Sequence, residues 1–286
     1  MKLLVTGASG FTGQHFVARA RACGHDVVAL QANLTDVPAL QREVAQVAPE
    51  AVVHLAAIAF VGHDDVSAFY DVNVIGSINL LEALLALPQA PRSVLLASSA
   101  NVYGNCEQSP IAETEVPAPV NHYAMSKLAM EVMARNYVKR LPLFFVRPFN
   151  YTGPGQEGSF LIPKMVDHFA RRADTIELGN LNVEREFNDV RFVCDAYLKL
   201  IERAAPGEVY NICSGQPVTL TSVLELLTDI TGHHLQVKVN PAFVRSNEIH
   251  RLCGDPARLH GVVGAVEQPP LRATLVDMLA AAGSAA

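Results

Sequence analysis

Tyr123 and Lys127 stand four residues apart in the stretch YAMSK, just after a proline-rich run. Four residues make about one helical turn, so in a helix both side chains would lie on one face. A nearby ammonium group favours the phenolate and lowers the pKa of a tyrosine from its usual value of about 10. The pair could therefore act in acid–base chemistry, although this spacing also arises by chance in many helices. The remaining motifs of the chain must decide between the two interpretations.

A second candidate for chemistry is a glycine loop near the N-terminus, in the stretch LLVTGASGFTG. Gly7, Gly10 and Gly13 have a spacing in which the first glycine permits a tight turn and the second lets the backbone approach a pyrophosphate. The third allows close packing of the following helix, whose N-terminus offers N–H groups and a positive dipole end to phosphate. The loop thus predicts dinucleotide binding, and the alternative is a plain strand–helix turn.

The elements that must position these motifs alternate along the first half of the chain. Short apolar runs indicate buried strands, and the longer segments between them have helical periodicity. Strands alternating with helices indicate βαβ units and a parallel sheet whose two faces are covered by helices. The expected strands are 2–7, 26–30, 51–57, 93–99 and 141–150, and the expected helices are 13–24, 36–49, 67–87 and 123–140.

The second half of the chain differs, because helices and short strands no longer alternate strictly after about Asn150. We therefore predict an α/β fold, a Rossmann-type doubly wound parallel sheet with a smaller C-terminal α/β substrate-binding lobe. The dinucleotide-binding domain is expected to comprise residues 1–150 and about 186–205, the latter returning as a strand and a helix. The smaller lobe is expected to comprise residues 151–185 and 206–286.

Composition argues against several classes of protein and partner. Half of the 286 residues are hydrophobic and 17% are charged, which is typical of a compact globular chain. The net charge of −6, without a basic stripe, argues against nucleic acid and anionic membranes as partners. No apolar run reaches the roughly 18 residues of a membrane span, and no signal peptide is visible, so we expect a cytoplasmic location. The five cysteines are irregularly spaced, so neither a disulfide framework nor a metal site is expected.

The end of the second expected strand bears on the choice of cofactor. Rossmann proteins often hold the 2′-hydroxyl of the adenosine ribose with an acidic residue there. Here the strand runs into VVALQANLTD, with Gln31 in the expected acidic position and no arginine beside it to bind a 2′-phosphate. The sequence therefore leaves the choice between NADH and NADPH open.

Taken together, the motifs resemble the extended short-chain dehydrogenase/reductase family, which is rich in enzymes of nucleotide sugars. Each motif alone is weak, but they occur in order over nearly the whole chain. They are TGASGFTG, VVHLAA, DVNVIGSINLLEA, ASSANVYG, YAMSK and VRPFNYTGPGQ.

The resemblance implies roles for individual residues. Tyr123 would be the catalytic phenol, Lys127 its partner and a ligand of the nicotinamide ribose, and Ser99 the hydroxyl that binds the reacting sugar oxygen. The cofactor would lie against Gly7, Gly10, Phe11, Thr12, Gly13, Asn33, Leu34, Leu55, Ala56, Ala57, Tyr123, Lys127 and Pro148. The nucleotide sugar would be held by Ser99, Asn101, Asn150, Arg185, Arg245 and Glu248.

The resemblance also bears on the reaction. Dehydratases of the family carry an Asp-Glu pair directly after the catalytic hydroxyl, and here these positions are Ala100 and Asn101. The stretch LGNLNVEREF is similar to that of family members acting on GDP-mannose derivatives, although Glu186 replaces their usual aspartate. We therefore expect an NADPH- or NADH-dependent reduction of the C4 ketone of a GDP-6-deoxy-4-keto sugar. The substrate would be GDP-4-dehydro-6-deoxy-D-mannose, giving GDP-D-rhamnose, or a heptose analogue.

Two other functions stay open, a nucleotide-sugar 4-epimerase with tightly bound NAD and a non-catalytic dinucleotide-sensing binding protein. The expected helices around 73–87 and 126–138 are apolar on more than one face, and such helices need covering. Since the family commonly pairs these helices across a two-fold axis, we expect a homodimer.

Overall fold

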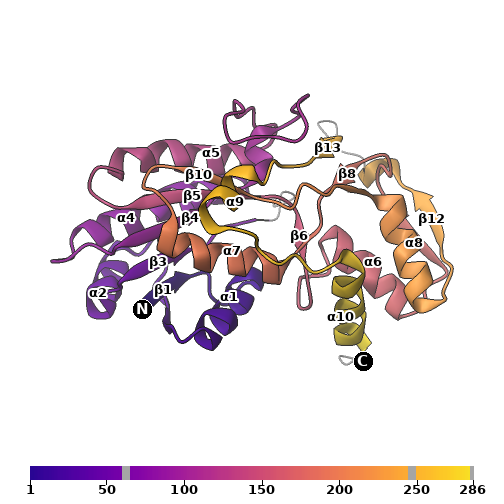
Figure 1. The fold of residues 1–286 in the computed structure, drawn as a ribbon, viewed down its shortest axis with the longest axis horizontal. Helices are drawn as coiled ribbons and strands as arrows, with labels where there is room; N and C mark the ends of the chain where they lie inside the picture. The colour runs from indigo at the N-terminus through magenta and orange to yellow at the C-terminus, as the bar shows by residue number, and fades with distance from the viewer. Residues whose placement is uncertain (60–64, 244–248, 284–286) are drawn as a thin grey trace.

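A six-stranded parallel sheet forms the centre of the larger lobe (Figure 1). The computed structural model describes residues 1–59, 65–243 and 249–283. The strands are β1 (Lys2–Thr6), β2 (Asp26–Ala29), β3 (Ala51–His54), β4 (Ser93–Ala97), β5 (Leu143–Pro148) and β10 (Val209–Ile212). Their order across the sheet is β10-β5-β4-β3-β1-β2, and every neighbouring pair is parallel. The predicted Rossmann-type α/β fold is confirmed.

Helices cover both faces of this sheet, because successive side chains of each strand point to opposite faces. Leu3 and Val5 of β1 belong to one apolar core, and Leu4 between them belongs to a second. The first core is completed by α1 (Phe11–Ala22), α7 (Val190–Arg203) and α9 (Ala257–Val263). The second is completed by α2 (Val37–Val47), α4 (Ser77–Leu85) and α5 (His122–Ala134).

The glycine loop connects β1 to α1 with little space to spare. Gly7 has a φ of +67°, and a Cβ added there would lie 2.7 Å from the backbone nitrogen of Ala56. A Cβ added at Gly13 would lie 2.1 Å from the carbonyl oxygen of Gly7. The helix therefore begins directly on the loop. The strand order also reverses here, between β1 and β3, which is where open α/β sheets bind ligands.

The helical run after β3 contains a local change of winding. We predicted one continuous helix over 67–87, but the structure has α3 (Val66–Tyr70), a π-helical segment η1 (Asp71–Gly76) and then α4. Only the run Val66–Leu85 among the described residues is long and apolar enough to cross a membrane, judged by length and composition alone. Leu80, Leu81 and Leu84 of this run are fully buried in the second of the two cores described above. The α4 part of the run therefore packs in the core of the larger lobe.

The smaller lobe has its own apolar core, built mainly from helices. These are α6 (Leu161–Ala170), α8 (Leu220–Thr231) and α10 (Leu271–Gly283). Its strands are short and form two small sheets. One pairs β7 (Thr175–Leu178) with β12 (Gln236–Val239), and the other is β11 (Val218–Thr219), β8 (Glu184–Arg185) and β13 (Arg251–Leu252).

The strand that begins near residue 186 does not join the large sheet. This strand, β9 (Asn188–Asp189), pairs with β6 (Tyr151–Thr152), and the sixth strand of the large sheet is instead β10. The helix that follows β9 does return to the first lobe, as α7. Both β10 and α9 lie beyond residue 205 and pack with the large sheet. We propose the two-domain division with these two elements placed in the first lobe.

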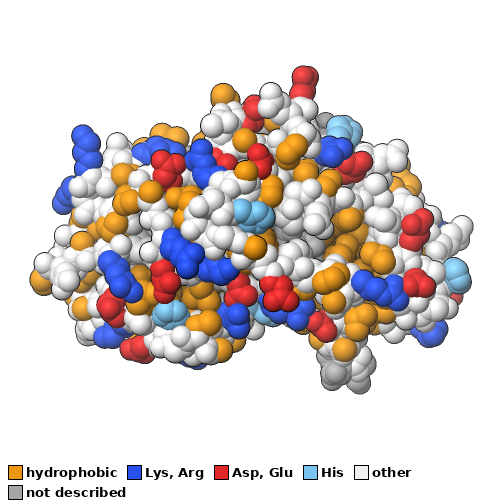
Figure 2. All heavy atoms as spheres, viewed as in Figure 1, with side chains coloured by type: hydrophobic (Ala, Val, Ile, Leu, Met, Phe, Trp, Pro, Cys, Tyr) orange, Lys and Arg blue, Asp and Glu red, His pale blue; other side chains and the backbone are white. Residues whose placement is uncertain are grey.

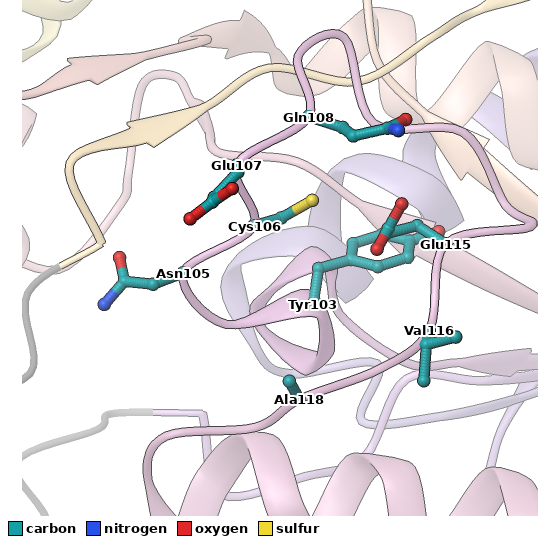
Figure 3. A pocket seen from close by; sticks show the side chains of 8 residues that line it. All are labelled: Tyr103, Asn105, Cys106, Glu107, Gln108, Glu115, Val116 and Ala118. Atoms are coloured by element: carbon teal, nitrogen blue, oxygen red, sulfur yellow. The ribbon is translucent and has the colours of Figure 1, made fainter.

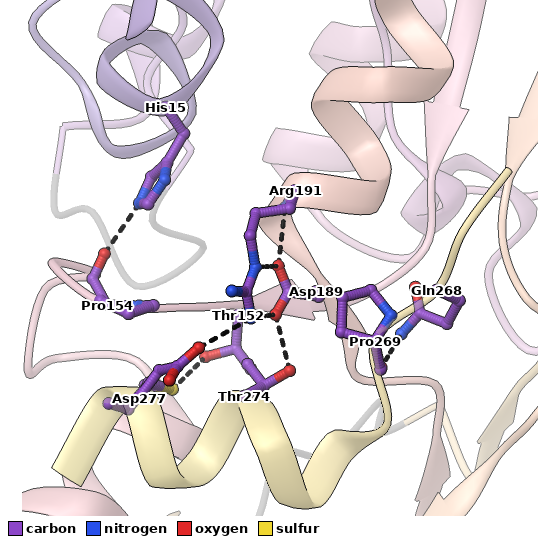
Figure 4. A network of polar contacts seen from close by, with 10 residues as sticks. His15, Thr152, Pro154, Asp189, Arg191, Gln268, Pro269, Thr274 and Asp277 are labelled. Carbon is purple, nitrogen blue, oxygen red and sulfur yellow. Dashed lines mark hydrogen bonds and ion pairs between the residues drawn. The ribbon is translucent and has the colours of Figure 1, made fainter. Parts of the chain in front are cut away.

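A polar network joins the two lobes where β9 meets α7 (Figure 4). The Asp189 carboxylate caps α7 through the backbone N–H of Arg191, at 2.7 Å, and also pairs with its guanidinium. Thr274 of α10 donates to the same carboxylate at 2.7 Å, and Asp277 pairs with Arg191 at 2.9 Å. The C-terminal helix is thereby tied to the start of α7.

Charged side chains are interspersed on the face of the molecule shown in Figure 2. Lysine and arginine alternate with aspartate and glutamate there, and no basic stripe is visible on this face. The absence of a nucleic-acid partner stays a prediction.

Candidate active site

The structure brings Ser99, Tyr123 and Lys127 together at the carboxyl edge of the sheet. Ser99 lies two residues after the end of β4 and caps a short 3-10 helix, η2 (Ala100–Tyr103), while the other two lie on α5. Their exposed fractions are 7%, 9% and 5%. Ser99 and Tyr123 share a side-chain hydrogen bond, and Lys127 Nζ donates to the carbonyl oxygen of Ala97 at 2.8 Å.

Burial sets the protonation of this group. It raises the pKa of Tyr123, and the hydrogen bond with Ser99 acts in the opposite direction. It also lowers the pKa of Lys127 from 10.5 to about 8, against the attraction of Glu131. The prediction that Lys127 lowers the pKa of Tyr123 is therefore wrong for this structure, because loss of solvation dominates and the ammonium is directed at a backbone carbonyl. Tyr123 is protonated at neutral pH.

A buried ion pair fixes the catalytic helix α5 to strand β5. Arg147 of β5 binds Glu131 of α5 through two hydrogen bonds of 2.9 and 2.6 Å, and their exposed fractions are 4% and 1%. The guanidinium lies 4.8 Å from the ring centre of Tyr103 in η2, whose hydroxyl donates to Asn211 of β10 at 2.7 Å. These contacts fix α5, β5, η2 and β10 to one another. Sequence reasoning missed them because no local pattern marks the partners.

A chain of hydrogen bonds also runs from the glycine loop to the π-helical segment. His54 at the end of β3 contacts Thr6 Oγ1 through Nδ1 at 2.7 Å and Ser77 Oγ through Nε2 at 2.8 Å. Ser77 in turn donates to the carbonyl oxygen of Asn73 at 2.7 Å. Burial lowers the pKa of His54 to about 3, so the ring is neutral and serves to position its neighbours.

Asn73 links that chain to the catalytic helix. Its side-chain amide accepts from the N–H of Ile58 at 2.9 Å and donates to the carbonyl oxygen of the same residue at 3.1 Å. It also donates to Ser126 Oγ at 3.0 Å, and Ser126 donates to the backbone carbonyl of Tyr123 at 2.8 Å. The π-helical winding places Asn73 in this position, in line with the frequent occurrence of such segments at functional sites.

The start of α1 has the properties of a phosphate site. Gly10 is the N-cap, and no described side chain caps the helix there. The open N–H groups and the dipole of α1 suit a pyrophosphate. Tyr151, which we did not predict, contacts Thr12 Oγ1 through its hydroxyl at 2.7 Å and stacks on Phe11 with ring centres 6.1 Å apart. A dinucleotide therefore fits the loop, bordered by the Tyr151 phenol.

The other predicted cofactor residues lie at the same edge of the sheet. Leu55, Ala56 and Ala57 follow β3, and Ala56 donates its N–H to Thr6 Oγ1 at 3.1 Å. Pro148 ends β5. In the loop after β2, the Asn33 side chain accepts from the N–H of Thr35 at 3.0 Å, and Leu34 is 6% exposed and packs in the core. Their contacts with a cofactor stay predictions.

The predicted substrate residues are more dispersed. Asn101 lies in η2, and Asn150 lies exposed between β5 and β6. Arg185 in β8 donates to the carbonyl oxygens of Glu184 and Ile249. Arg245 and Glu248 lie outside the described residues. Their roles stay predictions.

Glu186, the departure noted beside Arg185, is fully buried. Its carboxylate accepts from the N–H of Gly254 at 2.6 Å, from the N–H of Ser214 at 2.7 Å and from the side-chain amide of Asn188 at 3.1 Å. It joins the loop after β10 to the short strands of the smaller lobe. This carboxylate is structural, because it accepts hydrogen bonds from backbone N–H groups of two segments.

A hollow of about 300 Å³ lies beside this region without including the catalytic residues (Figure 3). Tyr103 lines it, together with Cys106 and Glu115 from the loop that follows η2. Burial raises the pKa of Cys106, so the thiol is not activated. Within the described residues, no group of three or more His, Cys, Asp or Glu side chains could hold a metal ion.

The parallel sheet, the glycine loop and the buried Ser–Tyr–Lys group define a dinucleotide-dependent protein of the Rossmann class. The model of the NAD dependent epimerase/dehydratase family matches residues 3–213, and this chain belongs to that family. The predicted membership of the extended short-chain dehydrogenase/reductase family is thus confirmed.

Two of the similar proteins have names that refer to GDP-6-deoxy sugars. GDP-6-deoxy-D-talose 4-dehydrogenase of Aggregatibacter actinomycetemcomitans is 39% identical over 269 residues, which cover 92% of each chain. GDP-6-deoxy-D-mannose reductase of Pseudomonas aeruginosa is 37% identical over 279 residues, covering 92% of this chain and 91% of the other. The structure of RMD from Pseudomonas aeruginosa complexed with NADPH is 34% identical, covers 100% of this chain and 98% of that chain, and has a TM-score of 0.91. The cofactor is a nicotinamide dinucleotide, as predicted.

Proposed function

We propose that this chain reduces the C4 ketone of a GDP-6-deoxy-4-keto sugar, with NADH or NADPH as reductant and Tyr123 as proton donor. The observation that carries the proposal is the buried Ser99–Tyr123 pair with Lys127 one helical turn further on, beside the glycine loop. The two similar proteins reported above support the sugar class. One is named a 4-dehydrogenase and the other a reductase, so both names describe oxidoreductases of GDP-6-deoxy sugars.

Ketone reduction needs a hydride at carbon and a proton at oxygen. A reduced nicotinamide, when bound, supplies the hydride. Tyr123 donates its proton to the C4 oxygen, and Ser99 donates a hydrogen bond to the same oxygen, so both stabilise the negative charge that develops there. The raised pKa of Tyr123 keeps the phenol in the donating form at neutral pH.

Lys127 acts on the state that follows proton transfer. The transfer leaves a phenolate at Tyr123, which water then reprotonates, and a nearby ammonium stabilises that anion. The bond from Lys127 to the Ala97 carbonyl, at 2.8 Å, holds the ammonium at the end of β4, next to Ser99. Ion pairing of Glu131 with Arg147 keeps the Glu131 carboxylate from drawing Lys127 away.

The residues after Ser99 favour reduction over dehydration. Ala100 is 1% exposed and Asn101 carries an amide, so neither can move the protons that loss of water from C5 and C6 requires. For the diphosphate of the substrate we propose Arg185 and Asn150. A planar guanidinium binds such a group through more than one bond. Arg245 and Glu248, in the segment outside the described residues, are proposed to bind phosphate and the nucleotide ribose, with the acidic residue suited to the ribose hydroxyls.

A coupled assay tests this function. The purified chain is mixed with GDP-mannose, a GDP-mannose 4,6-dehydratase and NADH or NADPH, and the reduced-nicotinamide absorbance is followed with Tyr123→Phe in parallel. We expect absorbance to fall with the wild-type chain only, and the C4 configuration of the product then separates the rhamnose from the talose product.

The same assay separates the alternatives. A 4-epimerase with tightly bound NAD would convert a nucleotide sugar without net loss of absorbance. A dinucleotide-sensing protein would bind NADH or NADPH but leave the sugar unchanged. If the 4-keto hexose is confirmed present and nothing is consumed, the hexose substrate is wrong, and a keto-heptose is the next substrate to test.

A further inference from the structure

A carboxylate from α2 reaches the loop after β2 and binds two successive backbone N–H groups there. Glu43 Oε1 accepts from Gln31 at 2.8 Å, and Oε2 accepts from Ala32 at 2.7 Å. Glu43 is half-buried, and no lysine or arginine in the described part of the chain forms an ion pair with it. The negative charge at this loop is therefore balanced only by backbone dipoles.

This loop lies where Rossmann proteins bind the adenosine part of the cofactor, so the Glu43 contact bears on the choice between NADH and NADPH. Rossmann proteins meet the adenosine ribose at the end of the second strand, usually through an acidic side chain. Here Gln31 stands at that place, and its side-chain amide donates to the carbonyl oxygen of Ala29 at 3.0 Å. The acid missing from the strand is supplied from α2, twelve residues further along the chain. The sequence showed that the usual acidic residue is absent at Gln31, but it did not indicate that Glu43 takes its place.

Two adjacent N–H groups that point the same way form an anion-binding concavity. In this chain Glu43 occupies it. Each N–H group donates one strong hydrogen bond, so neither is available to a phosphate while the carboxylate is bound. A 2′-phosphate carries nearly two negative charges at neutral pH and would face a carboxylate instead of a cation.

A ribose 2′-hydroxyl, in contrast, would be attracted to the Glu43 carboxylate. A carboxylate offers about four lone-pair positions, and the two backbone bonds use two of them. The remaining positions can accept a hydrogen bond from the hydroxyl of NADH. Glu43 thus attracts one cofactor and repels the other.

We propose that Glu43 makes this chain selective for NADH over NADPH by filling the N–H pair of Gln31 and Ala32 with the protein's own anion. The structure of the similar Pseudomonas aeruginosa protein was determined with NADPH, the cofactor that we expect this chain to disfavour. The proposal rests on the dinucleotide site and not on the identity of the sugar.

Fluorescence titration of NADH and NADPH tests the proposal without any sugar present, so a wrong sugar assignment cannot alter the result. We expect the wild-type chain to bind NADH at least about tenfold more tightly than NADPH, which corresponds to about 1.4 kcal/mol. Glu43→Gln removes the charge while keeping an acceptor, and it should bring the two dissociation constants to within about threefold, mainly by strengthening NADPH. Glu50→Gln is the matched control, because Glu50 also accepts a backbone N–H, from Lys2 at 2.6 Å, but at the amino ends of β1 and β3, away from the cofactor site.

The salt dependence of the wild-type chain gives a second readout that needs no variant. Salt screens repulsion between Glu43 and a 2′-phosphate, so the preference for NADH should shrink as ionic strength rises. A cationic phosphate site would behave in the opposite way, with salt weakening NADPH. Equal or tighter NADPH binding by the wild-type chain would overturn the proposal, as would an unchanged ratio in a folded Glu43→Gln variant. Binding of neither nucleotide would overturn the dinucleotide site and this proposal together.

Discussion

The two lobes differ in how the residues of the candidate site are supported. In the larger lobe, the catalytic group rests on buried polar residues that bind one another, among them His54, Asn73 and the Glu131–Arg147 pair. In the smaller lobe, Arg185 lies on a strand of two residues. Glu186 beside it is buried, but the Arg251–Glu184 ion pair of the same small sheet is largely exposed. Buried hydrogen bonds hold the catalytic group, whereas short strands and an exposed ion pair surround Arg185. We infer that chemistry is preorganised in this chain and that recognition of the nucleotide is not.

The largest effect should come from the reacting phenol. Tyr123→Phe keeps the ring that packs in the site and removes the proton donor, so we expect kcat to fall by about 10²–10⁴-fold. The midpoint of thermal unfolding should change little, because the hydroxyl has only Ser99 as its partner among the contacts described here. Steady-state kinetics and a melting curve on the same sample check both statements. A variant with more than about a tenth of wild-type kcat would show that another group donates the proton.

The buried ion pair should dominate stability in the larger lobe. Glu131→Gln leaves the charge of Arg147 without a partner, and we expect the free energy of unfolding in urea to fall by about 3–5 kcal/mol. Asp195→Asn is the matched control, since it breaks an exposed arginine pair with Arg19 in the same lobe. That change should cost about 0–1 kcal/mol. Equal costs for the two variants would mean that burial does not distinguish the pairs.

The contact between the lobes should matter less for stability and more for local motion. Thr274→Val removes the hydrogen bond to the buried Asp189 carboxylate, which should cost about 1–3 kcal/mol. In this variant the rate of amide hydrogen exchange should rise more in α10 than in the large sheet. Thr221→Val, at an exposed position of α8, is the control and should leave exchange in α10 unchanged. Faster exchange spread evenly over both lobes would contradict a local role.

A smaller effect should appear in the pH dependence. The pKa of Lys127 in the folded chain is about 8, so the rate of reduction should decline as the pH rises through that value and the ammonium is lost. The free energy of unfolding should instead increase over the same pH range. Between about 8 and 10.5 the unfolded chain binds more protons at this position than the folded chain, so the cost of burying the ammonium is relieved and stability increases as the pH rises. Rate and urea profiles measured together check the two signs, and a flat rate profile through this range would contradict the assignment.

The predicted homodimer offers a final test, with the smallest expected effect on the chemistry. Ile75 of η1 and Val132 of α5 are 53% and 56% exposed, and both lie on the helices that are expected to pair. Val132→Asp should shift the mass found by light scattering from dimer to monomer and leave single-turnover reduction intact. A wild-type chain of monomer mass would make the homodimer prediction wrong.

How much the sequence could predict depended on the range of the interactions. The glycine loop and the strands β1 to β5 were predictable, because turn chemistry and apolar runs are local signals. The π-helical segment was not, since its winding goes with contacts that Asn73 makes to Ile58 and Ser126. Glu43 and the pairing of Glu131 with Arg147 likewise depend on partners that only the fold brings close. The same holds for β10, whose place in the large sheet no local pattern indicates.

The most direct test of the proposed reaction follows the hydride itself. Nicotinamide carrying deuterium at its transferable position is incubated with the chain and a GDP-4-keto-6-deoxy sugar, and the product is examined by NMR. The buried Ser99–Tyr123–Lys127 group predicts one deuterium atom at C4 of the product, with a single configuration at that carbon. A product free of deuterium, or a sugar returned with its ketone intact while the label stays on the cofactor, would contradict C4 reduction by this chain.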